Sequence, residues 1–417
     1  MPSSIADCGI PKESSRRIVV WTHVWRLEVA GMSRLRWGMV GGGEGSQIGF
    51  THRAAAELDR EFELVAGAFD IDPGRSRSFG NSLGLDFEHV YGDWQSMLAA
   101  ESECANRLDL VTIATPNNSH FEICRAFLQA GFHVLCEKPL TITRESAQEL
   151  HAVAVTGEQI CAVNFGYTGY PLVRQMRAMV INGELGKVRL VKTEFAAGFL
   201  ADAQSDTNPR VRWRFDPELA GPSCVMADMG SHAMHLACFT TGQQIKRLSA
   251  DFANGVQGRQ LEDDASVVFR MEGGTIGRLW VSGIALGKTH GLSIQIFGEQ
   301  GGLCWNQEHP DQLLWTPLNG SSQILERGTV SLAPEAQTAN RLAVGHPEGM
   351  VLAFANIYRD LAASIRTSGD GSTISPRQHL FPSVVDGRHM VDVVCIAAQS
   401  SKAGSQWLDV PTQEDWV

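Results

Sequence analysis

The sequence predicts an α/β domain with a parallel sheet, followed by an α+β domain with a largely antiparallel sheet. From residue 35, short apolar strands alternate with segments of helical periodicity, which is the pattern of βαβ units. After Gly166 the pattern changes, and residues 292–296 alternate apolar and polar side chains, as in an antiparallel strand with one buried face. We therefore expect the two domains to cover residues 34–166 and 167–417.

The first domain is expected to contain five strands with helices between them. Strands are predicted at residues 35–40, 62–69, 108–114, 133–136 and 160–165. Ser119, followed three residues later by Glu122, predicts a capping box at the start of a helix. Gly131 suits the left-handed end of that helix, and another helix is predicted from Thr143 to about Val155.

The second domain is expected to combine a sheet with helices near the end of the chain. Strands are predicted at residues 187–195, 265–271, 275–281 and 292–296. Gly273 and Gly274 separate two of these strands and predict a hairpin turn. Residues 316–345 carry little periodic signal and are expected to be irregular, whereas helices are predicted at residues 348–365 and 387–400.

Composition limits the class of protein. Hydrophobic residues make up 43% of the 417-residue chain and charged residues 19%, which is typical of a soluble globular protein. The formal net charge of −11 argues against nucleic-acid binding, and no apolar run approaches the ~20 residues that span a bilayer. Nine scattered cysteines without a CxxC pair indicate reduced thiols and a cytoplasmic protein.

Residues 1–33 differ in character from the rest and are expected to be a poorly ordered extension. Met32 lies directly before the first predicted strand and would be a natural start of the chain. Arg16 and Arg17 weakly resemble a twin-arginine export signal, so export is the alternative to a cytoplasmic location. The apolar stretch after them is short and lacks a small-residue cleavage site, which argues against export.

A glycine turn after the first strand predicts a dinucleotide site. Glycines there let the backbone approach a pyrophosphate, which the amides at the start of the next helix then bind. The usual third glycine is replaced by Ser46, and Gly49 follows three residues later, so the loop is expected to be longer than usual. The expected cofactor contacts of this loop are Gly41, Gly42, Gly43, Ser46, Gln47 and Ile48.

Asp70 ends the second predicted strand, 21 residues after Gly49. An acidic residue at this place hydrogen-bonds the adenosine ribose and repels a 2′-phosphate, so it favours NAD over NADP. Arg75 and Arg77 keep NADP open as an alternative, although both are more simply explained as solvated helix charges.

Glu137, Lys138 and Pro139 follow directly on the apolar strand at 133–136. Ligands of parallel α/β sheets bind at the carboxyl ends of the strands, so this position places an amine beside the expected cofactor. A solvated strand-end charge is the simpler explanation for an isolated lysine. Because the glycine turn and Asp70 point to the same edge, we favour a catalytic role for Lys138.

Asp228 and His232 form a second candidate pair. Their four-residue spacing would place both side chains on one helical face, where a carboxylate can orient an imidazole that acts as a general base. A helix salt bridge or a core histidine is the structural alternative. His235 extends this face, but three ligands on one helix suit a tetrahedral metal poorly, so no metal is expected.

These motifs together resemble the glucose-fructose oxidoreductase / inositol dehydrogenase / MocA (Gfo/Idh/MocA) family. The similarity runs from about Arg34 to the C-terminus. It is carried by motifs in the order of that family, namely Gly41-x-Gly43, Asp70, Ala114-Thr115-Pro116-Asn117-xx-His120, Glu137-Lys138-Pro139, Gly183-Glu184-Leu185-Gly186 and Asp228-xxx-His232. The glycine loop, residues 220–222 and residues 346–349 resemble the subgroup of levoglucosan and glycoside 3-dehydrogenases.

The resemblance implies a Rossmann domain, an open-faced C-terminal sheet often used for oligomerisation, and NAD(P)-dependent oxidation of a secondary hydroxyl of a sugar or cyclitol. It implies that Lys138 and His232 are the catalytic pair, with Asp228 beside them. The remaining cofactor contacts that it implies are Thr115, Pro116, Asn117, His120 and Glu137. A homodimer or homotetramer that binds a small sugar or cyclitol, and neither nucleic acid nor a membrane, is expected.

Polar and aromatic residues of the second domain are candidates for holding the substrate, because aromatic faces and arginine forks suit sugars. They are Tyr167, Tyr170, Arg212, Trp213 and Arg214. Two other functions stay open on this fold, an NAD-dependent glycosidase that oxidises C3 transiently and a non-catalytic NAD-binding regulator. An intact set of Lys138, Asp228 and His232 argues against the regulator.

Overall fold

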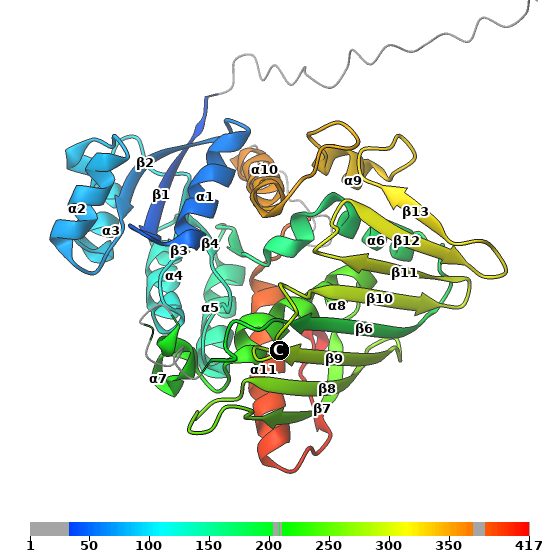
Figure 1. The fold of residues 1–417 in the computed structure, drawn as a ribbon. Helices are drawn as coiled ribbons and strands as arrows, with labels where there is room; N and C mark the ends of the chain where they lie inside the picture. Colours follow the sequence, from blue (N-terminus) through cyan, green and yellow to red (C-terminus); the bar gives the residue numbers. More distant parts are fainter. Residues whose placement is uncertain (1–32, 203–207, 209–210, 370–379, 417) are drawn as a thin grey trace, which may run out of the picture. The chain divides into compact units, whose positions relative to one another are not determined.

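The first part of the chain forms a five-stranded sheet in which all neighbours are parallel (Figure 1). The computed structural model describes residues 33–202, 208, 211–369 and 380–416, so the expected extension at residues 1–33, apart from Ser33, lies outside the described residues. The strand order is β2-β1-β3-β4-β5. The bounds are Leu35–Gly41 (β1), Phe62–Ala68 (β2), Leu110–Ala114 (β3), His133–Cys136 (β4) and Cys161–Val163 (β5). The five predicted strands are thereby confirmed.

Helices connect these strands. Their bounds are Gln47–Leu58 (α1), Pro73–Ser82 (α2), Trp94–Glu103 (α3), His120–Gln129 (α4) and Arg144–Thr156 (α5). Thr143 caps α5 through its side chain, as its residue type favours. The predicted capping box at Ser119 is wrong. A 3₁₀ turn, Asn117–Ser119, precedes α4, and the Ser119 hydroxyl donates instead to the carbonyl of Pro116, at 2.7 Å.

The second sheet has nine strands in the order β13-β12-β11-β10-β6-β9-β8-β7-β14, and the last of these, β14, is Leu408–Asp409. All neighbouring strands are antiparallel except the central pair β6 and β9. The bounds of its main strands are Val188–Ala196 (β6), Ile245–Ala253 (β7), Asp264–Met271 (β8), Ile276–Ser282 (β9), Ser293–Gly298 (β10) and Gly301–Asn306 (β11). Gly273 and Gly274 form the turn between β8 and β9, as predicted.

One face of this sheet is covered by helices, whose bounds are Pro171–Ile181 (α6), Ser231–Thr241 (α8) and Val384–Lys402 (α11) (Figure 1). The alternation of β6 shows why: Val191 and Phe195 are buried, whereas Lys192 between them is exposed. The opposite face carries the exposed side chains. The predicted helix at residues 387–400 corresponds to the middle of α11.

The expectation that residues 316–345 are irregular is wrong in part. This stretch holds the end of β12 (Gln312–Pro317), all of β13 (Gln323–Glu326) and helix α9 (Pro334–Ala339). Strand β13 has four residues, three of them exposed, so it lacks the buried side chains from which a strand is predicted. It lies at the end of the sheet, where it pairs with β12.

Helix α10, Met350–Gly369, comes late in the sequence but packs against α1, a helix of the first domain (Figure 1). Its Tyr358 ring meets the edges of Trp37 and Phe62, with ring centroids 5.7 and 5.6 Å away. The core of the first domain therefore includes a helix from the other end of the chain. Among the described residues, no helix combines the length and the apolar character that crossing a membrane requires.

Candidate active site

A cleft of about 810 Å³ extends from the start of α1 to the second sheet. Its walls come from the glycine loop and α1, from the ends of β4 and β5, and from the second domain. The lining includes Glu44, Gly45, Ser46, Gln47, Ile48, Thr51, Glu137, Lys138, Asn164, Tyr167, Phe195, Trp213, Arg214, Asp228, His232 and His290. The cleft thus joins the predicted cofactor loop to the predicted catalytic residues.

The glycine loop is built for close approach of backbone to backbone. Gly41 and Gly42 have φ angles of 79° and 67°, which favour glycine. A Cβ on Gly49 would stand 2.0 Å from the carbonyl oxygen of Gly42, so Gly49 supplies the tight contact between helix and loop. Ser46 caps α1 by accepting a hydrogen bond from the Gly49 amide, at 3.1 Å. The loop and helix start fit a dinucleotide phosphate.

Asp70 lies directly after β2, where the adenosine ribose is expected. Both its carboxylate oxygens are hydrogen-bonded by Arg75, from Nη2 at 2.9 Å and from Nε at 3.2 Å. This pairing, opposed in part by burial, holds the pKa of Asp70 below its usual value. An ionised carboxylate therefore follows β2 at the position where the sequence predicts the contact that favours NAD, with an exposed arginine beside it.

The lining of the cleft does not include Thr115, Pro116, Asn117 or His120. The His120 ring is fully buried between two carbonyl oxygens, with Nδ1 2.8 Å from that of Pro139 and Nε2 2.9 Å from that of Thr115. It therefore links the segment after β3 to the segment after β4. In this arrangement His120 positions the backbone beside Lys138 and does not face the cleft.

Lys138 is held by Asp228. Its Nζ donates to Asp228 Oδ1 at 2.7 Å and to the Asp228 carbonyl at 2.6 Å, while Arg214 Nε donates to Oδ2 at 2.7 Å. Burial would raise the pKa of Asp228, but the two cations outweigh it and hold that pKa well below the usual range. Asp228 is thus an anion that fixes the Lys138 ammonium at the cleft.

A π-helical turn, Met226–Gly230, precedes α8, so Asp228 and His232 do not share one regular helical face. From the four-residue spacing we expected Asp228 to orient His232. The Asp228 carboxylate instead pairs with Lys138 and Arg214. Sequence spacing alone cannot register a π turn, which adds a residue to the helical repeat.

His232 lies deep in the cleft. Burial first, and the nearby Lys138 charge second, lower the pKa of His232 well below its usual value, so the ring is neutral. Its Nδ1 has no hydrogen-bond partner among the described residues. The ring stands edge-on to Tyr167, with centroids 4.8 Å apart. A neutral imidazole beside a fixed ammonium suits a general base.

The five candidates for substrate binding fall into two groups. Tyr167, Trp213 and Arg214 line the cleft, and the Tyr167 hydroxyl lies 2.8 Å from Nε2 of His290. The other two do not line it. Tyr170 is buried behind Tyr167, where its hydroxyl accepts a hydrogen bond from Gln307, and Arg212 is exposed in a 3₁₀ turn.

Four further residues at or behind the cleft carried no signal in the sequence: His52, Asn164, His290 and Tyr358. His52 and Asn164 donate to the same oxygen of Glu137, at 2.9 and 2.5 Å. His290 comes from the loop between β9 and β10. These contacts join segments that are far apart in the sequence, and no local motif marks them.

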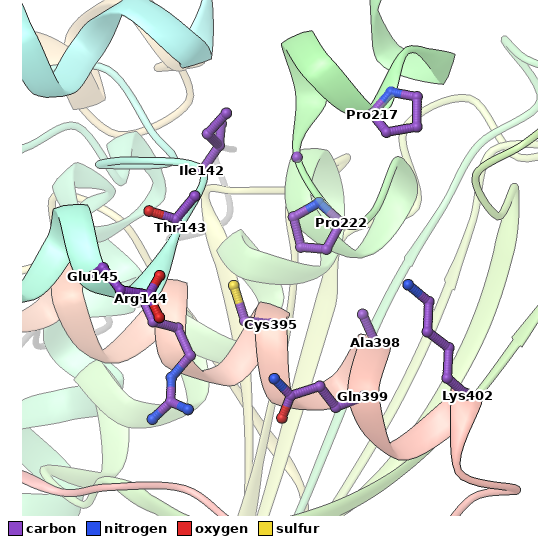
Figure 2. A pocket seen from close by; sticks show the side chains of 11 residues that line it. Ile142, Thr143, Arg144, Glu145, Pro217, Pro222, Cys395, Ala398, Gln399 and Lys402 are labelled. Atoms are coloured by element: carbon purple, nitrogen blue, oxygen red, sulfur yellow. The ribbon is translucent and has the colours of Figure 1, made fainter.

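A smaller hollow of about 420 Å³ lies between the start of α5, the segment after α7 (Pro217–Ala220) and helix α11. Figure 2 shows Arg144, Cys395 and Lys402 among its side chains. Arg144 is paired with Asp392 at 2.6 Å, and burial raises the pKa of Cys395 to about 12, so the thiol is protonated. The predicted catalytic residues Lys138, Asp228 and His232 line the larger cleft and not this hollow.

One family model matches nearly all of the first domain, and another matches about half of the second. The model described as an oxidoreductase family with an NAD-binding Rossmann fold matches residues 35–165. The model of the GFO/IDH/MocA C-terminal domain matches residues 173–304. Both matches follow the motifs on which the resemblance was based.

Relatives align with this chain over nearly their whole length. An uncharacterised oxidoreductase of Bacillus subtilis (strain 168) is 36% identical over 90% of this chain and 96% of its own length. The levoglucosan dehydrogenase of Pseudarthrobacter phenanthrenivorans is 25% identical over 91% of this chain and 99% of its own. An inositol dehydrogenase homologue from Azotobacter vinelandii, solved with NADH and myo-inositol, is 39% identical with a TM-score of 0.85, covering 90% of this chain and 98% of that one.

Proposed function

The chain belongs to the Gfo/Idh/MocA family of oxidoreductases with an NAD-binding Rossmann domain, and we propose that it is a dehydrogenase that oxidises a secondary hydroxyl of a cyclitol or sugar with NAD. The observation that carries this proposal is one continuous cleft. This cleft extends from the glycine loop, which fits a dinucleotide phosphate, to Lys138 and to the neutral, buried His232.

Oxidation of an alcohol requires a base for the hydroxyl proton and an acceptor for the hydride. Bound NAD⁺ supplies that acceptor at its nicotinamide. His232, which is neutral, takes the hydroxyl proton. Lys138 donates a hydrogen bond to the same oxygen and stabilises the negative charge that develops there. Asp228 keeps Lys138 in place, and Arg214 holds Asp228 from the other side.

The likeness to relatives favours a cyclitol as the first substrate to test. The homologue solved with myo-inositol is 39% identical to this chain, whereas the levoglucosan dehydrogenase is 25% identical. The polar and aromatic walls of the cleft, with Tyr167, Trp213 and His290, suit a ring that carries several hydroxyls.

The test is a screen of inositols, free sugars and glycosides with NAD⁺, followed through the absorbance of NADH. Steady NADH release with a cyclitol or sugar is the expected result. A glycosidase with tightly bound NAD would cleave a glycoside without releasing NADH, and a regulator would turn over nothing. Either outcome would contradict the proposal.

A further inference from the structure

Glu137 lines the cleft, precedes the predicted catalytic Lys138 in the sequence and is hydrogen-bonded to His52 of α1, the helix that follows the glycine loop. Its side chain is 11% exposed, and it lines the cleft together with Asn164 and Thr51. On the proposed function, the cofactor phosphates bind at the start of α1 and the hydride is transferred beside Lys138. A cofactor bound in this way would place its nicotinamide end close to Glu137.

A buried chain of hydrogen bonds ends on this carboxylate. Because a carboxylate only accepts, Nε2 of His52 carries the hydrogen toward Glu137. Nδ1 of His52 lies 2.8 Å from the Tyr358 hydroxyl, which in turn lies 2.9 Å from the Thr112 hydroxyl. Trp37 completes the chain by donating to Thr112, also at 2.9 Å. The chain thus begins at the Trp37 indole, which only donates, and terminates on an anion.

The second oxygen of Glu137 accepts from the backbone amide of Lys138, at 3.2 Å. Burial alone would raise the pKa of Glu137, but the bonds from His52 and Asn164 and the Lys138 charge hold it below its usual value. Glu137 is therefore an ionised carboxylate although it is almost fully enclosed.

The charges near Lys138, where the hydride would be transferred, indicate a role for the Glu137 carboxylate. Lys138 and Arg214 are positive and both pair with Asp228, while His232 is neutral. Taken together without Glu137, these four groups carry a net positive charge. The nicotinamide ring is cationic in NAD⁺ and neutral in NADH, so an excess of positive charge would disfavour the oxidised form.

We propose that Glu137 is the counter-charge of the oxidised nicotinamide and sets the relative affinity of the protein for NAD⁺ and NADH. The chain from Trp37 to His52 holds the carboxylate in position for this role. The proposal rests on the proposed function only in that the cleft binds NAD, and it concerns binding alone.

The experiment measures the dissociation constants of NAD⁺ and NADH by calorimetric titration, without substrate, for the wild type and Glu137→Gln. Loss of the charge should weaken NAD⁺ relative to NADH by about tenfold, the size expected for one ion pair across several ångströms of protein. Equal changes for both forms, or no change, would overturn the proposal.

A charge-swapped variant tests the same idea without loss of the hydrogen bond. In Glu137→Gln combined with Asn164→Asp, the amide and the carboxylate exchange places across the 2.5 Å contact. The wild-type ratio of affinities should return. If Glu137→Gln alone does not fold, this variant decides: a wild-type ratio supports the proposal and a lost NAD⁺ preference contradicts it.

Glu101→Gln is the matched control. Glu101 is a fully buried carboxylate that also pairs with a histidine, His89 at 2.8 Å, but it does not line the cleft. Its replacement should leave the affinity ratio unchanged, and a shifted ratio would show that the effect of Glu137→Gln is not local. A wild type that binds neither form would instead refute the NAD-dependent function.

Discussion

At the scale of single residues, Lys138 carries the sharpest expectation. The Lys138 Nζ donates hydrogen bonds to both the carboxylate and the backbone carbonyl of Asp228. Lys138→Ala should cost about 3 kcal/mol or more of transition-state stabilisation, which lowers turnover by at least two orders of magnitude. NAD⁺ affinity, measured by titration, should stay nearly unchanged. Normal turnover in this variant would remove Lys138 from the mechanism.

His232 gives the pH dependence. The ring must be neutral to accept a proton, and its pKa is lowered by burial and by Lys138. Activity should therefore hold through neutral pH and fall only when the pH drops toward that lowered pKa, below the usual value of about 6.5. A profile of turnover against pH tests this. An acid limb centred at or above the usual histidine value, or a fully active His232→Ala variant, would contradict the assignment.

Asp70 is expected to set the preference for NAD. Its ionised carboxylate would repel a 2′-phosphate, whereas its partner Arg75 would attract one once the acid is removed. Asp70→Ala should thus shift the ratio of kcat/KM values toward NADP, and Arg75→Ala in the same background should reverse part of the shift. If the unmodified protein already prefers NADP, the role given to Asp70 is incorrect.

Residues carried by a local motif could be predicted, and residues joined only by tertiary packing could not. Lys138 follows a buried strand, and the parallel pattern fixes which edge of the sheet that strand end faces. His52 and Tyr358 touch across 306 residues of sequence, and each alone looks like an ordinary core residue. The partners of Asp228 were mistaken for the same reason, since Arg214 reaches it from a separate turn.

At the scale of elements, the start of the helix that holds Asp228 depends on Glu262. Its carboxylate accepts from the Ser223 hydroxyl at 2.5 Å and from the amides of Cys224 and Met226 at 3.2 and 3.0 Å. Glu262→Ala would leave these buried donors without a partner, at about 1–3 kcal/mol. Denaturant unfolding should show that loss, and turnover should fall with it because Asp228 shifts.

Glu262→Gln keeps one acceptor oxygen and should retain more stability than the alanine variant. Equal stability of Glu262→Ala and the wild type would show that the amides find other partners. The element itself could not be foreseen: the spacing of Asp228 and His232 predicted a regular helix, and the π turn became visible only in the structure. Long strands with buried alternation were predicted, while the short edge strand β13 was not.

At the scale of the whole molecule, the uncovered face of the second sheet predicts self-association. Leu190, Ile276 and Phe297 are neighbours across β6, β9 and β10, and Ile276 and Phe297 are 38% and 42% exposed. Such a row favours burial against a second copy. We expect a dimer or tetramer in light scattering, and Ile276→Lys should lower the mass. A monomeric wild type at micromolar concentration would contradict this.

Helix α10 makes the two halves of the chain interdependent. It returns from beyond the second sheet to cover α1, and its Tyr358 belongs to the hydrogen-bonded chain that reaches Glu137. A fragment that stops at Gly166 would expose the apolar surface of Trp37 and Phe62, so it should aggregate when expressed alone. Chimaeras that exchange nucleotide-binding halves between relatives should fold only when residues 350–369 are inherited together with that half.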